Sequence, residues 1–229
     1  DMDHALMSLS IDALTPVFTL LAALAGGGEM PTPSLLKAVG MQGEMQMMAT
    51  TGGVNTHRGA LFSIGLAVTA TSRLIAKKQR ISIDAIMEIV SDLAKGFPRP
   101  GNTHGAEVTK RYGIPGALDA ARSGYPEAVV AASISDPYRM LLKLMSTVED
   151  SNIYHRCGAE TAAEVKMLAQ NALALPDESL PTVLKKMDAD FISRKISPGG
   201  AADMLALAFF LQSVTSGDAA DAIGEEESL

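Results

Sequence analysis

Four short polar clusters hold all four histidines of this chain. They read DMDH (residues 1–4), GGVNTHRGA (52–60), GNTHGAE (101–107) and DSNIYHRCG (150–158). In each cluster the imidazole stands near carboxylates, amides, hydroxyls or guanidinium groups, which bind metal ions and phosphates and move protons. The rest of the chain is rich in Ala, Leu, Met and Val, and aromatic residues make up only 4%. This pattern predicts a plain scaffold that carries several pieces of one polar site.

The cluster GGVNTHRG has the features of an anion-binding turn. Its Gly-Gly pair (52–53) lets the backbone adopt positive φ and approach a ligand closely. A helix is expected to begin just beyond it and to offer free N–H groups to a phosphate. His57 and Arg58 would stand in the first turn of that helix, where cations are normally disfavoured, so a bound anion would explain them. The alternative is a Gly-rich turn capped by Asn55 or Thr56, with both cations solvated.

The DSN element offers oxygen ligands for a cation. Asp150 and Asn152 supply a carboxylate and an amide oxygen, and such hard ligands suit Mg²⁺. His155 and Arg156 follow within the same seven residues. The alternative is an Asx-turn between two helices. Two further carboxylates could join a metal site, namely Glu44 and Asp203.

Helical periodicity dominates the segments between these clusters. Strand-like alternation is almost absent, so we expect an all-α protein, a single compact multi-helix domain whose site is built from helix ends and Gly-rich turns. That domain should span residues 1–216, followed by an acidic and flexible tail at 217–229. The expected helices are 4–24, 33–49, 59–78, 82–94, 126–132, 137–148, 159–172, 180–193 and 200–214.

Composition narrows the class of partner. The net charge is −7, which argues against nucleic acid or an anionic membrane as the main partner but permits a Mg²⁺-bound polyphosphate. Cys157 is the single cysteine, which suits a reducing, cytoplasmic compartment. No unbroken apolar run reaches the roughly 18 residues of a membrane span. The HD dipeptide and the GxSxG, HExxH and GxxxxGK[ST] motifs are all absent from the sequence, which removes several common hydrolase and nucleotide-binding sites.

At these same clusters the chain resembles the triphosphoribosyl-dephospho-CoA synthase family, which serves citrate lyase and malonate decarboxylase. The shared motifs run in family order along essentially the whole chain. The HR pair after the DSN element is more similar to the malonate decarboxylase branch. The family also carries a Pro- and Gly-containing motif and an Asn-Gly-rich segment upstream of DMD, so we expect this chain to begin after them. The motifs are DMD (1–3), TGGVNTHRGALFSIGL (51–66), THG (103–105), RYGIPGALDAARSGYP (111–126), DSNIYHRCG (150–158) and SPGGAADML (197–205).

The resemblance implies a transferase reaction with two substrates, ATP and 3′-dephospho-CoA. The ribose 2′-hydroxyl of dephospho-CoA attacks the anomeric carbon of ATP, and adenine leaves. The product is the precursor of the prosthetic group of an acyl carrier protein. Such a reaction would need Mg²⁺ and cationic groups to hold the triphosphate, a carboxylate to stabilise an oxocarbenium-like state, and an acid and a base.

The resemblance also suggests a role for each candidate residue. Asp150, His155 and Glu44 are the catalytic candidates, with His155 as the leading acid or base. The metal candidates are Asp150, Asn152, Glu44 and Asp203. The substrate-binding candidates are Gly52, Gly53, Asn55, Thr56, His57, Arg58, His104, Arg111, Arg156, Ser197, Gly199 and Gly200.

Two other functions fit the same residues. One is a Mg²⁺-dependent nucleotide N-glycosidase or ADP-ribose-processing hydrolase that uses water in place of the CoA hydroxyl. The other is a non-catalytic helical module that binds a nucleotide or CoA. A homodimer is a further expectation, as is the absence of nucleic-acid and membrane partners.

Overall fold

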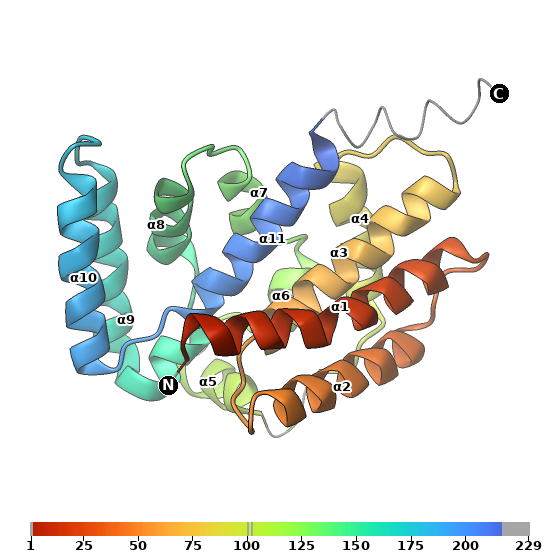
Figure 1. Cartoon of the computed structure of the whole chain (residues 1–229), viewed down its shortest axis with the longest axis horizontal. Helices are drawn as coiled ribbons and strands as arrows, with labels where there is room; N and C mark the ends of the chain where they lie inside the picture. Colours follow the sequence, from red (N-terminus) through yellow and green to blue (C-terminus); the bar gives the residue numbers. More distant parts are fainter. Residues whose placement is uncertain (1, 100, 102, 217–229) are drawn as a thin grey trace. The chain divides into compact units, whose positions relative to one another are not determined.

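The computed structural model describes residues 2–99, 101 and 103–216, and this part of the chain consists of helices and turns without a strand (Figure 1). The all-α prediction is confirmed. The helices are α1 (His4–Gly26), α2 (Pro33–Thr50), α3 (Arg58–Ala76), α4 (Ile83–Lys95), α5 (His104–Tyr112), α6 (Ala117–Arg122), α7 (Pro126–Ala131), α8 (Pro137–Thr147), α9 (Ser151–Leu173), α10 (Leu180–Arg194) and α11 (Gly199–Thr215).

The helix starts follow from side chains that accept a hydrogen bond from the first turn. Thr32 accepts one from Leu35 N–H at 3.3 Å, and Asp136 accepts one from Arg139 N–H at 2.7 Å. Ser82 does the same for α4 at 3.2 Å. These caps satisfy backbone donors that have no partner inside a helix. The starts predicted for α2, α4 and α8 are therefore confirmed.

Two expectations about helices were wrong. Helices α5 and α6 were not predicted, because nine and six residues are too few for a periodic apolar pattern to stand out. Residues 151–158 were expected to connect two helices, but they form the beginning of α9. The helix is broken only at Gly158, whose φ of 86° and ψ of 174° interrupt it. The polar residues before Gly158 suggested a loop, although Asp150 caps them as a helical turn.

The chain forms two compact units, and each is assembled from more than one stretch. The first contains residues up to 98, residues 121–124 and residues from 209 onward, and the second contains 99–120 and 125–208. The single domain over 1–216 stays a prediction. The acidic tail predicted at 217–229 lies outside the described residues, as do Asp1 and Asn102 of the polar clusters.

The first unit is built around α1, which packs against α2 and α3, while α3 also packs against α4. Figure 1 shows α1 and α2 running side by side. Leu14, Val17 and Leu21 line the buried face of α1. Gly43 allows α2 to approach closely, because a Cβ there would lie 3.0 Å from Val17 Cγ1 and 3.3 Å from Leu61 Cδ2. This packing fixes the end of α2, where the Gly-Gly turn begins.

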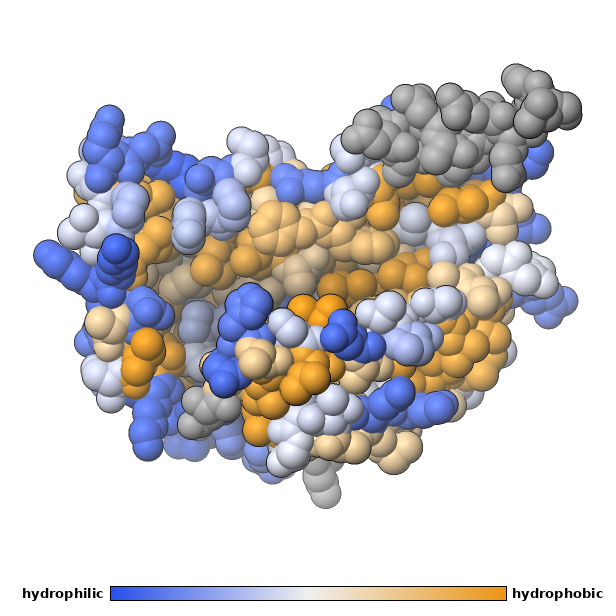
Figure 2. Space-filling model, viewed as in Figure 1, coloured by the Kyte–Doolittle hydropathy of each residue, from blue (hydrophilic) through white to orange (hydrophobic). Residues whose placement is uncertain are grey.

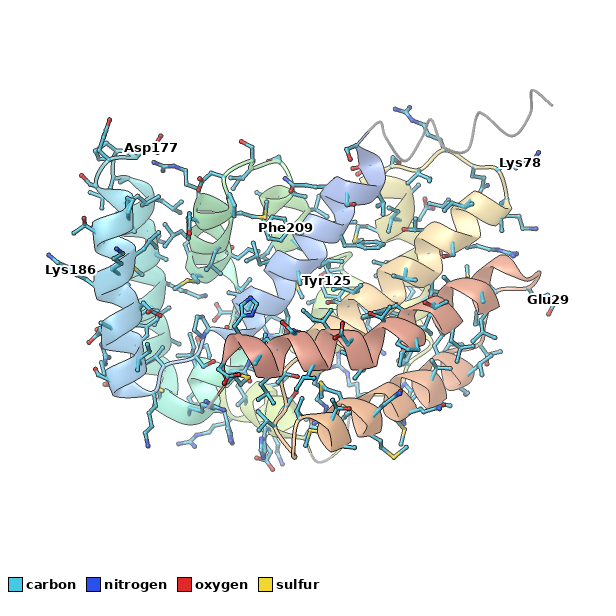
Figure 3. The ribbon with its side chains drawn as sticks, in the orientation of Figure 1. Glu29, Lys78, Tyr125, Asp177, Lys186 and Phe209 are labelled. Atoms are coloured by element: carbon cyan, nitrogen blue, oxygen red, sulfur yellow. The ribbon has the colours of Figure 1, made fainter. Side chains whose placement is uncertain are left out.

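The second unit is built around α9, which packs against α5, α8 and α10. Its core includes Met140 and Leu144 of α8 and Val165 of α9. Figure 2 shows mostly hydrophilic side chains on the outer side of α10, and Figure 3 shows Lys186 pointing away from that helix. The exposed ion pair between Arg194 and Glu164, at 2.5 Å, joins α10 to α9. These contacts position the first turns of α9, which carry the DSN element.

Two helices, α1 and α3, are long and apolar enough to cross a membrane by length and composition alone. The count of unbroken apolar runs missed them because Ser, Thr, Gly and Pro interrupt their sequences. Core helices pass the same test, and 56% of the apolar window of α3 is buried. The finding is weak evidence for a membrane, and the absence of a membrane partner stays a prediction.

Candidate active site

The Gly-Gly turn in the first unit has the backbone that its sequence predicts. Gly52 and Gly53 adopt φ of 64° and 89°, in the left-handed region that favours glycine. The hydroxyl of Thr51, which is buried, bonds to the carbonyls of Met47 at 2.8 Å and Val54 at 2.6 Å. These bonds tie the turn to the last turn of α2, so the backbone from 51 to 54 is held in place before any ligand arrives.

Asn55 and Arg58 follow this turn, and the side chains of both have partners within the first unit. Asn55 Oδ1 accepts the N–H of Arg58 at 3.2 Å, which is the capping contact of the structural alternative. The guanidinium of Arg58 lies 2.6 Å from Glu44 Oε1 on α2. Arg58 is about half exposed, so this pair is accessible to an incoming anion. Glu44 therefore neutralises Arg58 and orients it in the described structure.

His57 is bonded to a buried serine that the sequence analysis missed. Ser10 of α1 is 0% exposed, and its Oγ lies 2.7 Å from His57 Nδ1 and 2.6 Å from Thr56 Oγ1. The backbone N–H of His57 points to Met47 Sδ at 3.3 Å. Burial lowers the pKa of His57, which favours its neutral form. The sequence held a signal, because Ser10 lies on the apolar stripe of α1 and a buried hydroxyl requires a partner.

Asp150 in the second unit joins the starts of two helices. Its side chain caps α9 by accepting Asn152 N–H at 3.0 Å, and it accepts Ala201 N–H of α11 at 3.0 Å. The N–H groups of Gly200 and Ile153 bond to it as well. The carboxyl is 5% exposed; burial raises its pKa, while these four backbone bonds act in the opposite direction. One carboxyl thus satisfies donors from two helix N-termini.

The SPGG segment lies against the DSN element, as expected if both belong to one site. A Cβ on Gly200 would stand 3.1–3.2 Å from the carboxyl atoms of Asp150, and one on Gly199 would stand 2.7 Å from Asn152 Nδ2. Ser197 precedes α11 and is half-buried. The cavity beside Asp150 has a volume of only about 10 Å³, room for no more than a water molecule. Asp150 therefore faces packed protein rather than a nucleotide-sized space.

Two histidines of different clusters meet in the second unit. The rings of His104, at the start of α5, and His155, on α9, are stacked with centroids 4.2 Å apart and an angle of 13°. Both side chains belong to exposed residues, as do Arg111 and Arg156. The guanidinium of Arg111 lies 5.2 Å from the ring centre of Tyr112. The exposed face of α5 and α9 therefore carries two imidazoles and two guanidinium groups.

Asp203 of α11 lies close enough to Tyr125 to act on its titration. Burial raises the pKa of the Tyr125 hydroxyl, and the charge of Asp203 adds to this. The hydroxyl is buried and has no hydrogen-bond partner among the described residues. Asp203 was predicted as a metal ligand, and the neighbour identified for it is a phenol.

The predicted magnesium ligands come from both units: Glu44 belongs to the first, and Asp150, Asn152 and Asp203 belong to the second. No group of three or more His, Cys, Asp or Glu side chains in the part of the chain that the structure describes could hold a metal ion. The carboxyl of Asp150 is occupied by four backbone N–H groups, and Glu44 is paired with Arg58 in the other unit. The predicted set of Asp150, Asn152 and Glu44 therefore does not assemble within either unit. Magnesium itself stays a prediction.

The fold and the polar clusters define a helical protein whose Gly-Gly turn, arginines and histidines are suited to an anionic ligand, and comparison with known proteins gives its family. Residues 1–221 match the model of the ATP:dephospho-CoA triphosphoribosyl transferase (CitG) family, and the chain belongs to this family. The predicted family and enzyme class are confirmed. The two alternatives, a hydrolase and a non-catalytic module, receive no support from the comparisons.

Curated relatives agree with the family match. A protein of Pseudomonas syringae pv. tomato named "Probable 2-(5''-triphosphoribosyl)-3'-dephosphocoenzyme-A synthase" is 35% identical over 92% of this chain and 79% of its own length. The 2-(5''-triphosphoribosyl)-3'-dephosphocoenzyme-A synthase of Pectobacterium atrosepticum is 33% identical over 92% of this chain and 77% of its own. A crystal structure from Archaeoglobus fulgidus, whose name proposes a triphosphoribosyl-dephospho-CoA synthase, matches 90% of this chain and 98% of its own with a TM-score of 0.57. Its sequence identity is 14%, so it supports the fold alone.

Proposed function

We propose that this chain transfers the triphosphoribosyl group of ATP to the 2′-hydroxyl of 3′-dephospho-CoA and releases adenine. The observation that carries the proposal is the family match over residues 1–221. The 2′-oxygen forms a bond to the anomeric carbon of ATP, and the bond from that carbon to adenine breaks. The hydroxyl loses its proton to a base, and adenine leaves with a proton from an acid, so the reaction needs no oxidant or further substrate.

In this proposal the first unit holds phosphate. The Gly-Gly turn is preformed, the N-terminus of α3 follows it, and Arg58 is accessible beside Glu44. Backbone N–H groups at a helix N-terminus and a guanidinium group are the usual partners of phosphate oxygens. Magnesium would enter as the complex of ATP, since no group of three or more His, Cys, Asp or Glu side chains that could hold it is found among the described residues. Glu44 then serves to orient Arg58.

The second unit, taken by itself, carries the candidate acid–base groups. His104 and His155 are exposed and stacked, so either ring can exchange a proton with a ligand while the other supports its orientation. Arg111 and Arg156 on the same helices would contact anionic groups of a substrate. Asp150 would act by position, because it sets the starts of the two helices that carry Asn152, His155 and the 199–200 glycines.

The decisive experiment supplies the protein with Mg²⁺, ATP and 3′-dephospho-CoA and identifies the products by mass spectrometry. We expect adenine and a triphosphoribosyl adduct of dephospho-CoA in equal amounts, and neither when one substrate is omitted. Adenine release from ATP without dephospho-CoA would instead indicate the N-glycosidase. Binding of ATP without any adenine release would indicate the non-catalytic module. The expected cytoplasmic location and homodimer are separate predictions that this assay does not address.

A further inference from the structure

The Ser10 hydroxyl is the centre of a hydrogen-bond chain. Ser10 itself lies outside every motif of the sequence, whereas its partners Thr56 and His57 belong to the GGVNTHRGA cluster. It lies between Thr56 Oγ1 at 2.6 Å and His57 Nδ1 at 2.7 Å, and Ser10 is completely buried. Ser10 has one proton to donate, so only two arrangements satisfy all three groups. Either Thr56 donates to Ser10 and Ser10 donates to His57, or His57 donates to Ser10 and Ser10 donates to Thr56.

The partners of Thr56 favour one of these two arrangements. Its hydroxyl has no other hydrogen-bond partner among the described residues than Ser10. If Ser10 donated to Thr56, the proton of the half-buried Thr56 hydroxyl would have to go to solvent, because the chain shows no acceptor for it among the described contacts. If Thr56 donates to Ser10, both hydroxyl protons are used inside the chain, and the second one reaches His57 Nδ1. The first arrangement is therefore favoured, because it places each proton on an acceptor that the structure shows.

We propose that Ser10 fixes His57 as its Nε2–H tautomer, so that His57 offers the ligand a hydrogen-bond donor rather than a base. A neutral imidazole carries one proton, and Nδ1 must keep a lone pair to accept from Ser10. The lowered pKa of His57 supports the neutral form. The adjacent residue Arg58 is paired with Glu44 of α2, and burial is the only cause of the lowered pKa of His57.

This inference rests on the proposed function for its choice of ligand, and it deepens that function. A phosphate oxygen accepts hydrogen bonds and donates none in its ionised form, so an Nε2–H beside the Gly-Gly turn fits a phosphate of the triphosphate. It also separates the roles of the histidines. A donor at His57 cannot receive the proton of the attacking hydroxyl, so His57 is not the base of the proposed reaction.

The direct test is nitrogen NMR of the full chain with isotope-labelled histidine, recorded above the ordinary imidazole pKa of 6.5. A His57→Gln variant assigns the His57 signals. We expect a protonated Nε2 and an unprotonated Nδ1 in the wild type. A protonated Nδ1 would overturn the proposal, and this result does not depend on whether the protein is active.

Variants then distinguish the effect of Ser10 on the His57 tautomer from general effects on the fold. Ser10→Ala should let His57 exchange between tautomers and should raise the KM for ATP about tenfold with a smaller change in kcat, because one oriented bond to a charged group is lost. Thr56→Val should keep the Nε2–H tautomer of His57. If His57 instead donated to Ser10 and Ser10 to Thr56, the loss of the Thr56 acceptor would switch His57 to this tautomer from the Nδ1–H form. Ser63→Ala is the matched control, because Ser63 is 1% exposed and bonds only to the Ala60 carbonyl of its own helix among the described contacts. A Ser10→Ala protein with the wild-type tautomer would also overturn the proposal.

These outcomes distinguish the inference from the proposed function. If the tautomer is as expected and no triphosphoribosyl transfer occurs, the role of Ser10 stands and the reaction is wrong. If transfer occurs with a protonated Nδ1, the reaction stands and the role of Ser10 is wrong. Inorganic triphosphate serves as the probe for the ligand, since it should shift the His57 Nε2 signal in the wild type and should need an about tenfold higher concentration to do so in Ser10→Ala.

Discussion

Asp150 accepts a hydrogen bond from the backbone N–H of Ala201 at 3.0 Å, although the two residues are 51 positions apart in the chain. The same carboxyl caps α9 through Asn152 N–H. A buried group that satisfies donors from two helices constrains where both helices begin. The DSN and SPGG motifs are therefore neighbours because one side chain joins them, and this geometry leads to the first prediction.

Asp150→Ala should lower the free energy of unfolding by about 2–4 kcal/mol, since it removes the cap of α9 and leaves buried N–H groups of α11 without a partner. Urea unfolding followed by circular dichroism would measure the loss. The control is Asp136→Ala, because Asp136 is exposed and caps only α8, so its loss should cost about 1 kcal/mol. Equal losses in the two variants would show that the contact with Ala201 contributes nothing.

Gly200→Ala should destabilise the protein by about 1–3 kcal/mol, because the new Cβ would lie 3.1–3.2 Å from the carboxyl atoms of Asp150, which four backbone bonds hold in place. Thermal unfolding would detect the change. Gly40→Ala in α2 is the matched control, since nothing lies within 4 Å of its Cβ position. A helical Gly→Ala change without contacts should stabilise by about 0.5–1 kcal/mol, so opposite signs are expected. A stabilised Gly200→Ala protein would contradict the close packing.

His57 should make the protein less stable as the pH falls. Its pKa is lowered in the folded state, so below the ordinary value of 6.5 the unfolded chain binds more protons than the folded chain. The stabilisation is therefore fully present above 6.5 and is lost as the pH falls toward the folded-state pKa. Urea unfolding of wild type and His57→Gln across this range should show a stability difference that shrinks with decreasing pH. A difference that is constant with pH would exclude burial of a neutral His57.

The sequence predicted the class of fold because long apolar helices and their caps are local features. It also predicted the positive φ of Gly52 and Gly53, since glycine adopts positive φ without the steric cost that other residues meet. The partners of the site residues could not be predicted, because they depend on packing between distant segments. Ser10 meets His57 across 47 positions, and the local sequence shows only that a hydroxyl on the apolar stripe of α1 needs a partner, not which residue that partner is.

The partners of the carboxylates in the predicted metal site could not be read from the local sequence either. Carboxylates at Glu44 and Asp150 suggested a common cation, yet one is paired with Arg58 and the other with four backbone N–H groups. Local sequence shows that a carboxylate is present but not which donors surround it. A charged residue next to a helix start can be a cap or a ligand, and the tertiary contacts decide between them.

The stacked pair of His104 and His155 leads to the last prediction, which separates stacking from proton transfer. His155→Phe should keep a ring against His104 and leave stability nearly unchanged, while adenine release should fall by about 10²–10⁴-fold because the acid–base group is gone. His155→Ala removes both the ring and the proton carrier, so its turnover should fall as far. Arg139→Lys, on α8 of the same unit, is a control for structure alone: it disrupts the fork between Arg139 and Asp177 and should lower stability without a matching loss of turnover. Steady-state adenine release with saturating ATP and dephospho-CoA measures the effect. Turnover of His155→Phe within a few-fold of the wild type would exclude His155 as the acid or base and would leave His104 as the candidate.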